Sequence, residues 1–441
     1  MLRSSIAGTF KQRYLHSDKF VNGSKPELVI VDIRGEFSED EMADFSLDVF
    51  NVGFQTQSIV VALEHRSYGK SRPNSSPTTQ DLRKLLQTNQ AIADLVTFRE
   101  FIVKKYGLSG VKFVLMGCSY AGSLAAWARV KHPDLFLGAV ASCPVINLNY
   151  DFTEYLGFLS GLFSDERIGG SPACLAFIRR ASGIIKEKIA TSAGRRQIES
   201  VFGLRANYLE DQKTRLLWLS SNNARFMVQS NDPYCTKDLC NIKKKCNFVA
   251  KSDTSTEQKA LKVLDTIGSP VPGQHSAQDY NQHIKWLKDK SQLSDTRFNT
   301  FQSCSQWALF RSCNPGSKCP LVQDSGILGI EQAVCQDAFG ISKDDVQRNI
   351  AEEMKDFGGG GLKGTRNIIV LLGGMDPWNA VGRTQTTGRG PVQYQIPLAS
   401  HCYWDKAGAT RLDGVKQIMR KTVETTRSWV QADDGVTPLF L

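Results

Sequence analysis

Residues 111–127 contain the feature that most constrains the fold of this chain. An apolar run, Val-Lys-Phe-Val-Leu-Met, leads into the turn Gly-Cys-Ser-Tyr-Ala-Gly, and a helical run follows. A strand that turns into a helix within about four residues strains the backbone at the turn and needs small neighbours there. Gly117 and Ala121 supply them, although Ala121 stands where the pattern G-x-S-x-G has its second glycine. We therefore predict that Ser119 is a nucleophile for acyl transfer, against the alternative of a chance Gly/Ser pattern.

Short β-branched runs on both sides of this turn predict a sheet. Residues 79–106 carry apolar side chains at helical spacing up to Gly107, and a second amphipathic helix is predicted over 414–430. This β-α-β-α-β order predicts a mostly parallel sheet that helices cover on both faces. The predicted strands are the run from 111 and residues 28–33, 59–63, 138–142, 367–372 and 392–396.

The middle of the chain has a different pattern. Residues 147–290 contain long helical stretches, such as 173–189 and 212–219, and no convincing strand. We predict a helical cap, 147–335, inserted between two parts of one core, 1–146 and 336–441; the alternative is an added stabilising bundle. The four glycines at 358–361 predict a flexible joint.

Cysteines gather in the same central region. Eight of the eleven lie between Cys174 and Cys335, which favours disulfides that staple this region and an oxidising compartment. Cys235, Cys240 and Cys246 fit no standard zinc spacing, so we expect neither a metal nor a cofactor.

A serine nucleophile needs a base, and an acid that orients the base. In the α/β-hydrolase fold, which this strand and helix order matches, the acid and the histidine follow late strands, in that order. Of the six histidines, His401 fits because it comes shortly after the strand 392–396. Asp376 follows the strand 367–372 and is the predicted acid, with Asp405 as a possible substitute that comes after the histidine.

The oxyanion hole requires two backbone donors. The N–H of Tyr120, beside the nucleophile, is one candidate, and Gly35, in the loop after the first strand, is the other. The segment Glu64-His65-Arg66 ends another strand and is expected to brace the cleft rather than to react.

The formal net charge of +10 does not indicate nucleic-acid binding. The positive residues are dispersed, and the one dense run, Lys243 to Lys245, reads as a solvated loop. No stretch is long enough for a membrane span. Sequons at Asn22 and Asn74 favour a secretory route, yet the N-terminal residues lack the apolar run of a signal peptide. Either the true start lies upstream, which we expect, or the protein is not exported.

Several separated blocks of the sequence match one family pattern. They are 10–14 (F-x-Q-R-Y), 63–71 (E-H-R-Y-Y-G-x-S), 90–95 (Q-A-L-A-D), 117–127 (G-G-S-Y-G-G-x-L-A-A-W), 301–306 (Y-Q-x-C-T-E) and 374–378. Together they resemble the proline-specific serine exopeptidases, the family that includes lysosomal Pro-X carboxypeptidase, dipeptidyl peptidase II and thymus-specific serine protease. The resemblance implies an α/β-hydrolase fold with a helical cap, the triad Ser119, Asp376 and His401, and proline-containing peptide substrates. It also implies a lysosomal, vesicular or secreted protein, with a homodimer left open.

Three departures from the family pattern bear on function. Ala121 replaces a glycine, Gln306 replaces a glutamate, and Cys402 replaces the second histidine of a His-His pair. The last two put substrate preference in doubt more than catalysis. The sequence leaves open whether a C-terminal residue or an N-terminal dipeptide is released. An esterase or lipase on the same fold, and a catalytically silent binding protein, are the alternative functions.

Overall fold

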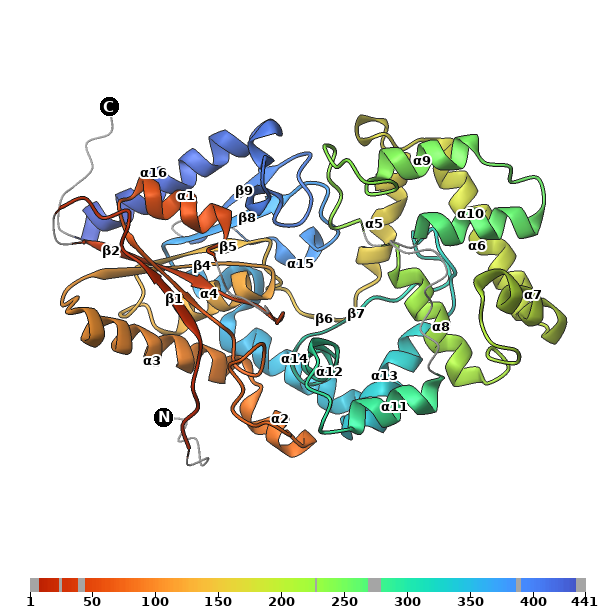
Figure 1. Ribbon diagram of the computed structural model, residues 1–441, viewed down its shortest axis with the longest axis horizontal. Helices are drawn as coiled ribbons and strands as arrows, with labels where there is room; N and C mark the ends of the chain where they lie inside the picture. The colour runs from red at the N-terminus through yellow and green to blue at the C-terminus, as the bar shows by residue number, and fades with distance from the viewer. Residues whose placement is uncertain are drawn as a thin grey trace.

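A central sheet with helices on both faces forms one part of the molecule, and a group of helices forms the other (Figure 1). The computed structural model describes residues 8–23, 26–38, 44–226, 228–268, 279–385 and 390–433. The strands of the sheet lie in the order β1-β3-β2-β4-β5-β8-β9 and are parallel except for the pair β1 and β3. Their bounds are β1 Tyr14–Ser17, β2 Leu28–Ile33, β3 Ile59–Leu63, β4 Lys112–Cys118, β5 Gly138–Ser142, β8 Ile368–Gly373 and β9 Val392–Ile396.

The predicted strands and the mostly parallel α/β-hydrolase sheet are confirmed, and β1 is an addition. All six residues of β2 are buried, because each face of the sheet is covered. On one face Val29 and Val31 join a core with α3 (Thr88–Tyr106) and α4 (Tyr120–Lys131). On the other, Ile30 packs in a core with α1 (Leu47–Gln55) and α16 (Val415–Asp433).

The predicted helix over 79–106 is wrong in one respect, because it is two helices. The helix α2 (Thr79–Leu85) ends and α3 begins at Thr88. Gln306 stabilises the break: its Nε2 donates to the Leu86 carbonyl over 2.9 Å, and its Oε1 accepts from the Thr88 N–H over 2.7 Å. A partner more than 200 residues away replaces the helical hydrogen bonds, which apolar spacing alone cannot reveal.

Helices dominate the chain between β5 and β8, as predicted. The expectation of no strand is wrong, since β6 (Asn149–Asp151) pairs in parallel with β7 (Ala308–Phe310). Strands of three residues are too short to show a period in the sequence. The helices here are α5 Thr153–Ser164, α6 Pro172–Ile189, α7 Ser192–Phe202, α8 Gln212–Ala224, α9 Ile242–Lys251, α10 Glu257–Gly268, α11 Tyr280–Lys288, α12 Asp295–Gln302, α13 Gly326–Phe339 and α14 Lys343–Phe357.

Four disulfides pair all eight central cysteines, which confirms that disulfides staple this region. They are Cys174–Cys246, Cys235–Cys240, Cys304–Cys335 and Cys313–Cys319. One cluster of buried hydrophobic residues extends from Leu115 in β4 to Ile178 in α6, so the helices and the sheet share a core. Among the described residues, no helix has both the length and the apolar character that crossing a bilayer requires.

The glycine run at 358–361 forms a packed turn instead of the expected flexible joint. Gly360 donates its N–H to Asn147 Oδ1 over 2.7 Å. A Cβ at Gly360 would lie 2.8 Å from the Arg383 carbonyl oxygen. A glycine therefore serves here for close approach of two backbones.

Candidate active site

The carboxyl ends of β4, β5, β8 and β9 meet at one edge of the sheet. Cys118 at the end of β4 lies opposite Ser142 of β5, and Gly373 of β8 lies opposite Ile396 of β9. Segments that leave these strands therefore start close together, although the chain visits them far apart. The three residues predicted to form a triad all follow these strands.

Ser119 sits in a sharp turn between β4 and α4. Its backbone has φ 58° and ψ −127°, a conformation that residues other than glycine rarely adopt. Its N–H donates to the Ser142 carbonyl over 2.8 Å, and the Ser123 N–H donates to its carbonyl over 3.0 Å. These bonds hold a strained residue in place, as expected of a functional turn.

Close packing around this turn explains why alanine is accepted at position 121. A Cβ on Gly117 would lie 2.6 Å from the Ala121 carbonyl oxygen, and one on Gly122 would lie 2.8 Å from the Ser142 carbonyl oxygen. Gly117 and Gly122 are therefore the positions that need glycine. The Ala121 methyl faces Gly35, where even an added Cβ would leave 3.7 Å.

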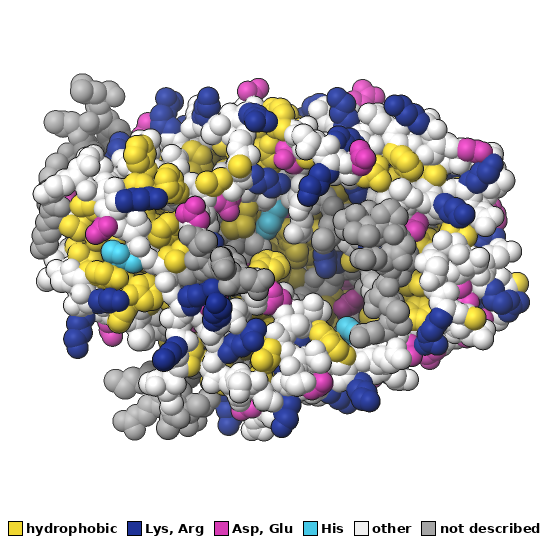
Figure 2. All heavy atoms as spheres, viewed as in Figure 1, with side chains coloured by type: hydrophobic (Ala, Val, Ile, Leu, Met, Phe, Trp, Pro, Cys, Tyr) yellow, Lys and Arg dark blue, Asp and Glu magenta, His cyan; other side chains and the backbone are white. Residues whose placement is uncertain are grey.

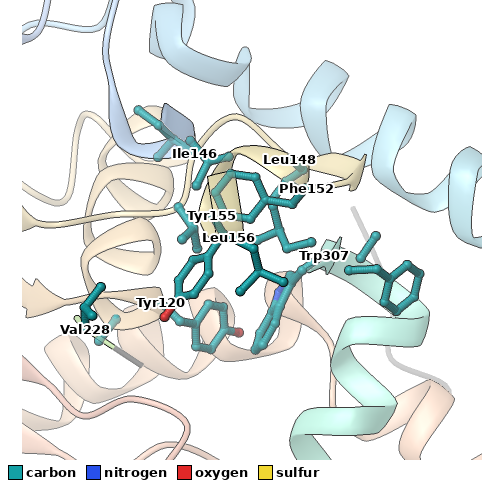
Figure 3. Packing of buried hydrophobic residues seen from close by; sticks show 14 of the residues in the cluster. Tyr120, Ile146, Leu148, Phe152, Tyr155, Leu156, Val228 and Trp307 are labelled. Carbon is teal, nitrogen blue, oxygen red and sulfur yellow. The ribbon is translucent and has the colours of Figure 1, made fainter. Parts of the chain in front are cut away.

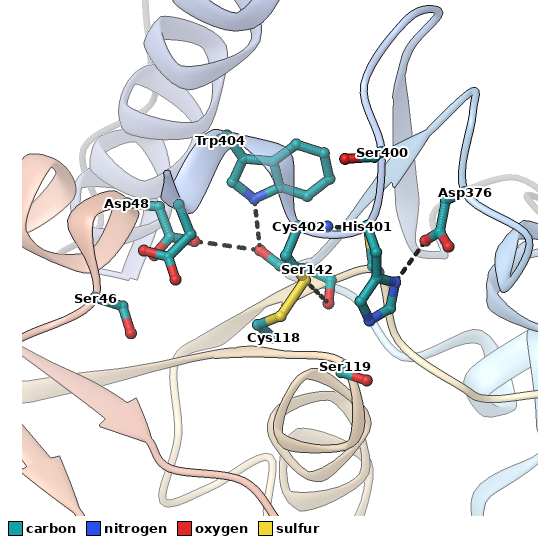
Figure 4. The surroundings of a disulfide bond; sticks show 12 residues. Ser46, Asp48, Cys118, Ser119, Ser142, Asp376, Ser400, His401, Cys402 and Trp404 are labelled. Carbon is teal, nitrogen blue, oxygen red and sulfur yellow. Dashed lines mark hydrogen bonds and ion pairs between the residues drawn. A yellow bond between two sulfur atoms is a disulfide. The ribbon is translucent and has the colours of Figure 1, made fainter. Parts of the chain in front are cut away.

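His401 and Asp376 form a close hydrogen-bonded pair. His401 Nδ1 and Asp376 Oδ2 are 2.6 Å apart, the Asp376 side chain is 1% exposed, and its Oδ1 also accepts the Trp378 N–H over 3.0 Å. In Figure 4 the imidazole lies between Asp376 and Ser119. Asp405 is directed elsewhere, because its Oδ1 accepts the Leu47 N–H over 2.6 Å at the start of α1. Such a pair can orient an imidazole that takes a proton from a serine, as the predicted triad requires.

The oxyanion-hole candidates come from two separate backbone segments. Tyr120 is the first residue of α4, where backbone N–H groups have no partner within the helix. The loop that carries Gly35 follows β2 and runs beside Ala121, next to the nucleophile turn. Two backbone segments therefore approach the place where an oxyanion would form.

A fifth disulfide, Cys118–Cys402, lies at the edge of the sheet where β4, β5, β8 and β9 end (Figure 4). It joins the residue before Ser119 to the residue after His401, across a sequence separation of 284. The expectation that disulfides concentrate in the central region missed this bond. The available signal was a cysteine beside Ser119 and another beside His401.

Removing this bond should cost much stability. We expect the variant Cys118→Ser/Cys402→Ser to lose about 2–4 kcal/mol of unfolding free energy, because a very long loop gains freedom in the unfolded chain. Urea unfolding measures this loss. The matched control is Cys235→Ser/Cys240→Ser, which opens a loop with a separation of 5. Equal losses in the two variants would contradict the expectation.

The sulfur atoms near His401 do not form a good metal site. Cys118 and Cys402 are oxidised in the disulfide. Cys143 is a buried free thiol whose pKa is raised by burial and by the charge of Asp376, so it stays protonated. Thiolates, not thiols, bind metal ions.

A buried carboxyl lies behind the disulfide. Asp48 Oδ2 accepts the Ser142 hydroxyl over 3.3 Å (Figure 4). Burial, with the charges of Asp405 and Asp32, raises the pKa of Asp48 to about 8. An unfolded aspartate titrates near pH ~3.9. Between these values the folded protein holds a proton that the unfolded chain has released, so stability falls as pH rises.

We therefore expect the protein to be less stable at pH 8 than at pH 5, by on the order of 2 kcal/mol from Asp48. Thermal and urea unfolding at both pH values measure the difference. Asp48→Asn carries a neutral side chain of the same shape and should flatten the dependence while keeping stability at pH 5. A wild type that gains stability toward pH 8 would refute the expectation.

The segment Glu64-His65-Arg66 is locked by internal contacts. His65 contacts the Arg66 carbonyl over 2.6 Å through Nδ1 and the Tyr120 hydroxyl over 3.4 Å through Nε2, and burial lowers the pKa of His65 to about 4. Arg66 Nε donates to Asp94 Oδ2 over 2.6 Å, and Glu64 accepts the Ser71 hydroxyl over 2.6 Å. His65 is therefore neutral, contacts both Arg66 and Tyr120, and helps to hold the Tyr120 side chain in place.

Gln229 connects the helical region to the site and had no signal in the sequence. Its carbonyl accepts the His401 N–H over 3.0 Å. Its Oε1 accepts from the Tyr155 hydroxyl and from Trp378 Nε1, each over 2.8 Å. The Trp378 ring centroid is 6.3 Å from that of His401, so an aromatic wall lies beside the imidazole.

Helical-region aromatics also pack on the residue after the nucleophile. The rings of Tyr120 and Trp307 are 4.4 Å apart, and Figure 3 shows Tyr155 in the same cluster. The segment between β5 and β8 thus contacts Tyr120, next to Ser119, and also His401. Its contacts restrict how the loops around the site can move.

Comparison with known proteins finds one family and several relatives. The model of the family described as serine carboxypeptidase S28 matches residues 2–421. A protein of Caenorhabditis elegans named as a serine protease is 26% identical, over 98% of this chain and 86% of that protein. The thymus-specific serine protease of Mus musculus is 26% identical over 90% and 78%, and the lysosomal Pro-X carboxypeptidase of Bos taurus is 24% identical over 97% and 85%.

Proposed function

Because this chain belongs to the serine carboxypeptidase S28 family and is a serine peptidase, we propose that it is an exopeptidase that cleaves peptide bonds at or near proline. The observation that carries the proposal is the His401–Asp376 pair beside the strained Ser119 turn. The name of the Pro-X carboxypeptidase relative supports the proline preference. Trp378, which is partly exposed and whose ring centroid lies 6.3 Å from that of His401, offers an apolar face on which a prolyl ring can pack.

The proposed mechanism uses residues of this chain alone. His401 takes the proton of the Ser119 hydroxyl as Oγ attacks the peptide carbonyl, and then gives it to the leaving amine. The N–H groups of Tyr120 and Gly35 stabilise the oxyanion. Water, activated by His401, then hydrolyses the acyl-enzyme, while Asp376 keeps the imidazole oriented.

We assign residues 147–335 to a cap, between core segments 1–146 and 336–441. Gln229, from this cap, reaches the backbone of His401, and Tyr155 contacts Trp378 at a centroid distance of 5.0 Å. A covered cleft would admit chain ends more readily than the middle of a folded chain. This supports an exopeptidase rather than an endopeptidase.

A lysosomal, vesicular or secreted location belongs to the same proposal. The five disulfides favour an oxidising compartment. Relatives with a lysosomal and an extracellular name support it. The sequon at Asn74 is a candidate for glycosylation, and a homodimer is an expectation that sedimentation can test.

The proposed function is tested with a substrate panel on purified full-length protein. Fluorogenic peptides that carry proline at the scissile position are compared with alanine analogues and with short acyl esters. We expect the prolyl peptides to be cleaved fastest, and a fluorophosphonate probe to label Ser119. Ester turnover far above peptide turnover would support the esterase alternative, and failure of labelling in folded protein would support the silent one.

A further inference from the structure

A cavity of about 630 Å³ lies in the helical region, between α8, α11, α12, α13 and β7. In Figure 2 the surface is hollowed between the two parts of the molecule, and basic, acidic and histidine side chains lie in the hollow. The polar side chains of the cavity wall include Ser220, Asn222, Asn299, Arg311 and Glu331. A cavity of this size holds several residues of a peptide.

Three ring contacts connect Arg311 in this cavity with the proposed triad. The Arg311 guanidinium lies 5.1 Å from the centre of the Tyr155 ring. The Tyr155 ring is 5.0 Å from that of Trp378, which in turn is 6.3 Å from that of His401. Because Tyr155 is buried, a peptide would pass beside these rings and not along them. At about 3.3 Å per extended residue, at most about five residues cover the distance from Arg311 to the His401 ring.

Among the charged side chains that line the cavity, Arg311 is the one suited to bind an anionic group of a ligand. Arg225, the other arginine of the wall, pairs with Asp265 over 2.7 Å. Within the described parts of the chain, no carboxylate forms a salt bridge with Arg311, although its guanidinium also bonds the Tyr155 hydroxyl and its charge acts on Glu331, which lines the same cavity. Burial raises the pKa of Glu331, which accepts the Ser220 hydroxyl, and burial lowers the pKa of His283, so both tend toward the neutral form.

The chemistry of a guanidinium fits a carboxylate. With one face on Tyr155, its edge N–H groups remain able to donate two parallel hydrogen bonds to a carboxylate. The competing group is Glu36, next to Gly35, which would suit a substrate ammonium. Burial raises the pKa of Glu36 to about 7, so below pH 7 it is mostly neutral, whereas an arginine keeps its charge.

We propose that Arg311 binds the C-terminal carboxylate of the peptide substrate in this cavity, so that the enzyme releases residues from the C-terminus. The proposal rests on the proposed serine exopeptidase function and adds the end of the chain that is recognised. The cavity then holds the leaving part of the peptide, and the scissile bond lies at Ser119.

The test compares N-blocked prolyl peptides that end in a free acid with the same peptides as C-terminal amides, with leaving parts of one to four residues. Wild type should have a KM about 10- to 100-fold lower for the best acid than for its amide. Arg311→Gln should raise the KM of the acid by the same factor. It should leave the KM of the amide and the kcat of both substrates unchanged. Arg311→Lys should recover part of the preference.

The control variant is Arg420→Gln, an exposed arginine on α16. It should change neither substrate. Equal KM values of acid and amide in wild type, loss of both substrates in Arg311→Gln, or cleavage only of peptides with a free N-terminus would each overturn the proposal. Fluorophosphonate labelling distinguishes failure of this proposal from failure of the proposed serine peptidase function. If wild type is labelled but does not prefer the acid, only the binding of the carboxylate by Arg311 is refuted. If folded wild type is not labelled, the serine mechanism is refuted.

Discussion

Ser119→Ala is expected to lower kcat for prolyl peptides by about 10⁴- to 10⁶-fold, with the remaining rate due to binding and the oxyanion donors. The variant removes the hydroxyl of Ser119, the residue that holds the strained backbone conformation of the turn. Alanine also avoids any new side-chain contact there, so KM should change little. Steady-state kinetics on the best prolyl substrate, together with fluorophosphonate labelling, measure the effect.

The control for this substitution is Ser164→Ala at the end of α5, where the hydroxyl lies 2.8 Å from the Ser160 carbonyl oxygen and 3.1 Å from that of Gly161, both in its own helix. It should keep full activity and labelling. Ser119→Ala itself should unfold at a temperature close to that of wild type. If it kept more than a few per cent of wild-type kcat, Ser119 would not be the nucleophile.

Asp376→Asn is expected to reduce kcat by about 10⁴-fold while leaving KM nearly unchanged. An amide nitrogen in place of Oδ2 would oppose the Nδ1 proton of His401, favour the wrong tautomer and remove the charge that stabilises the imidazolium. The variant side chain has the same shape, and its oxygen can still accept the Trp378 N–H. Labelling by fluorophosphonate should therefore slow down without disappearing.

Asp405→Asn is the matched control, since Asp405 is the other aspartate near His401 in the sequence. Its carboxylate accepts the Leu47 N–H and does not meet the imidazole. We expect its kcat to stay within a few-fold of wild type. A large loss of kcat in Asp405→Asn and a small loss in Asp376→Asn would show that Asp405, and not Asp376, orients His401.

Buried parallel strands and the order of the site residues were readable from the sequence because both leave local patterns. A strand with both faces covered, such as β2, is apolar throughout, and the turn at Ser119 needs small residues within a few positions. His401 and Asp376 follow strands whose carboxyl ends lie together in any parallel sheet. Chain order was therefore enough to predict the pair that forms the 2.6 Å contact.

Contacts between distant segments left no such pattern. The break between α2 and α3 depends on the Gln306 amide, and the position of His401 depends on the Gln229 carbonyl. The Cys118–Cys402 bond likewise joins residues that a pass along the chain meets far apart. Each of these contacts joins two single residues, so it leaves no repeating pattern in the sequence.

The sequence by itself determined the sheet, the nucleophile turn and the serine peptidase family, because strand burial, turn geometry and motif spacing act over a few residues at a time. Only the tertiary structure decided which cysteines pair across the site, how Gln229 and Trp378 support His401, and that Arg311 faces a cavity near the triad. The physical reason is that these features depend on side chains that chain folding brings together from distant elements. Local propensity carries no information about such partners.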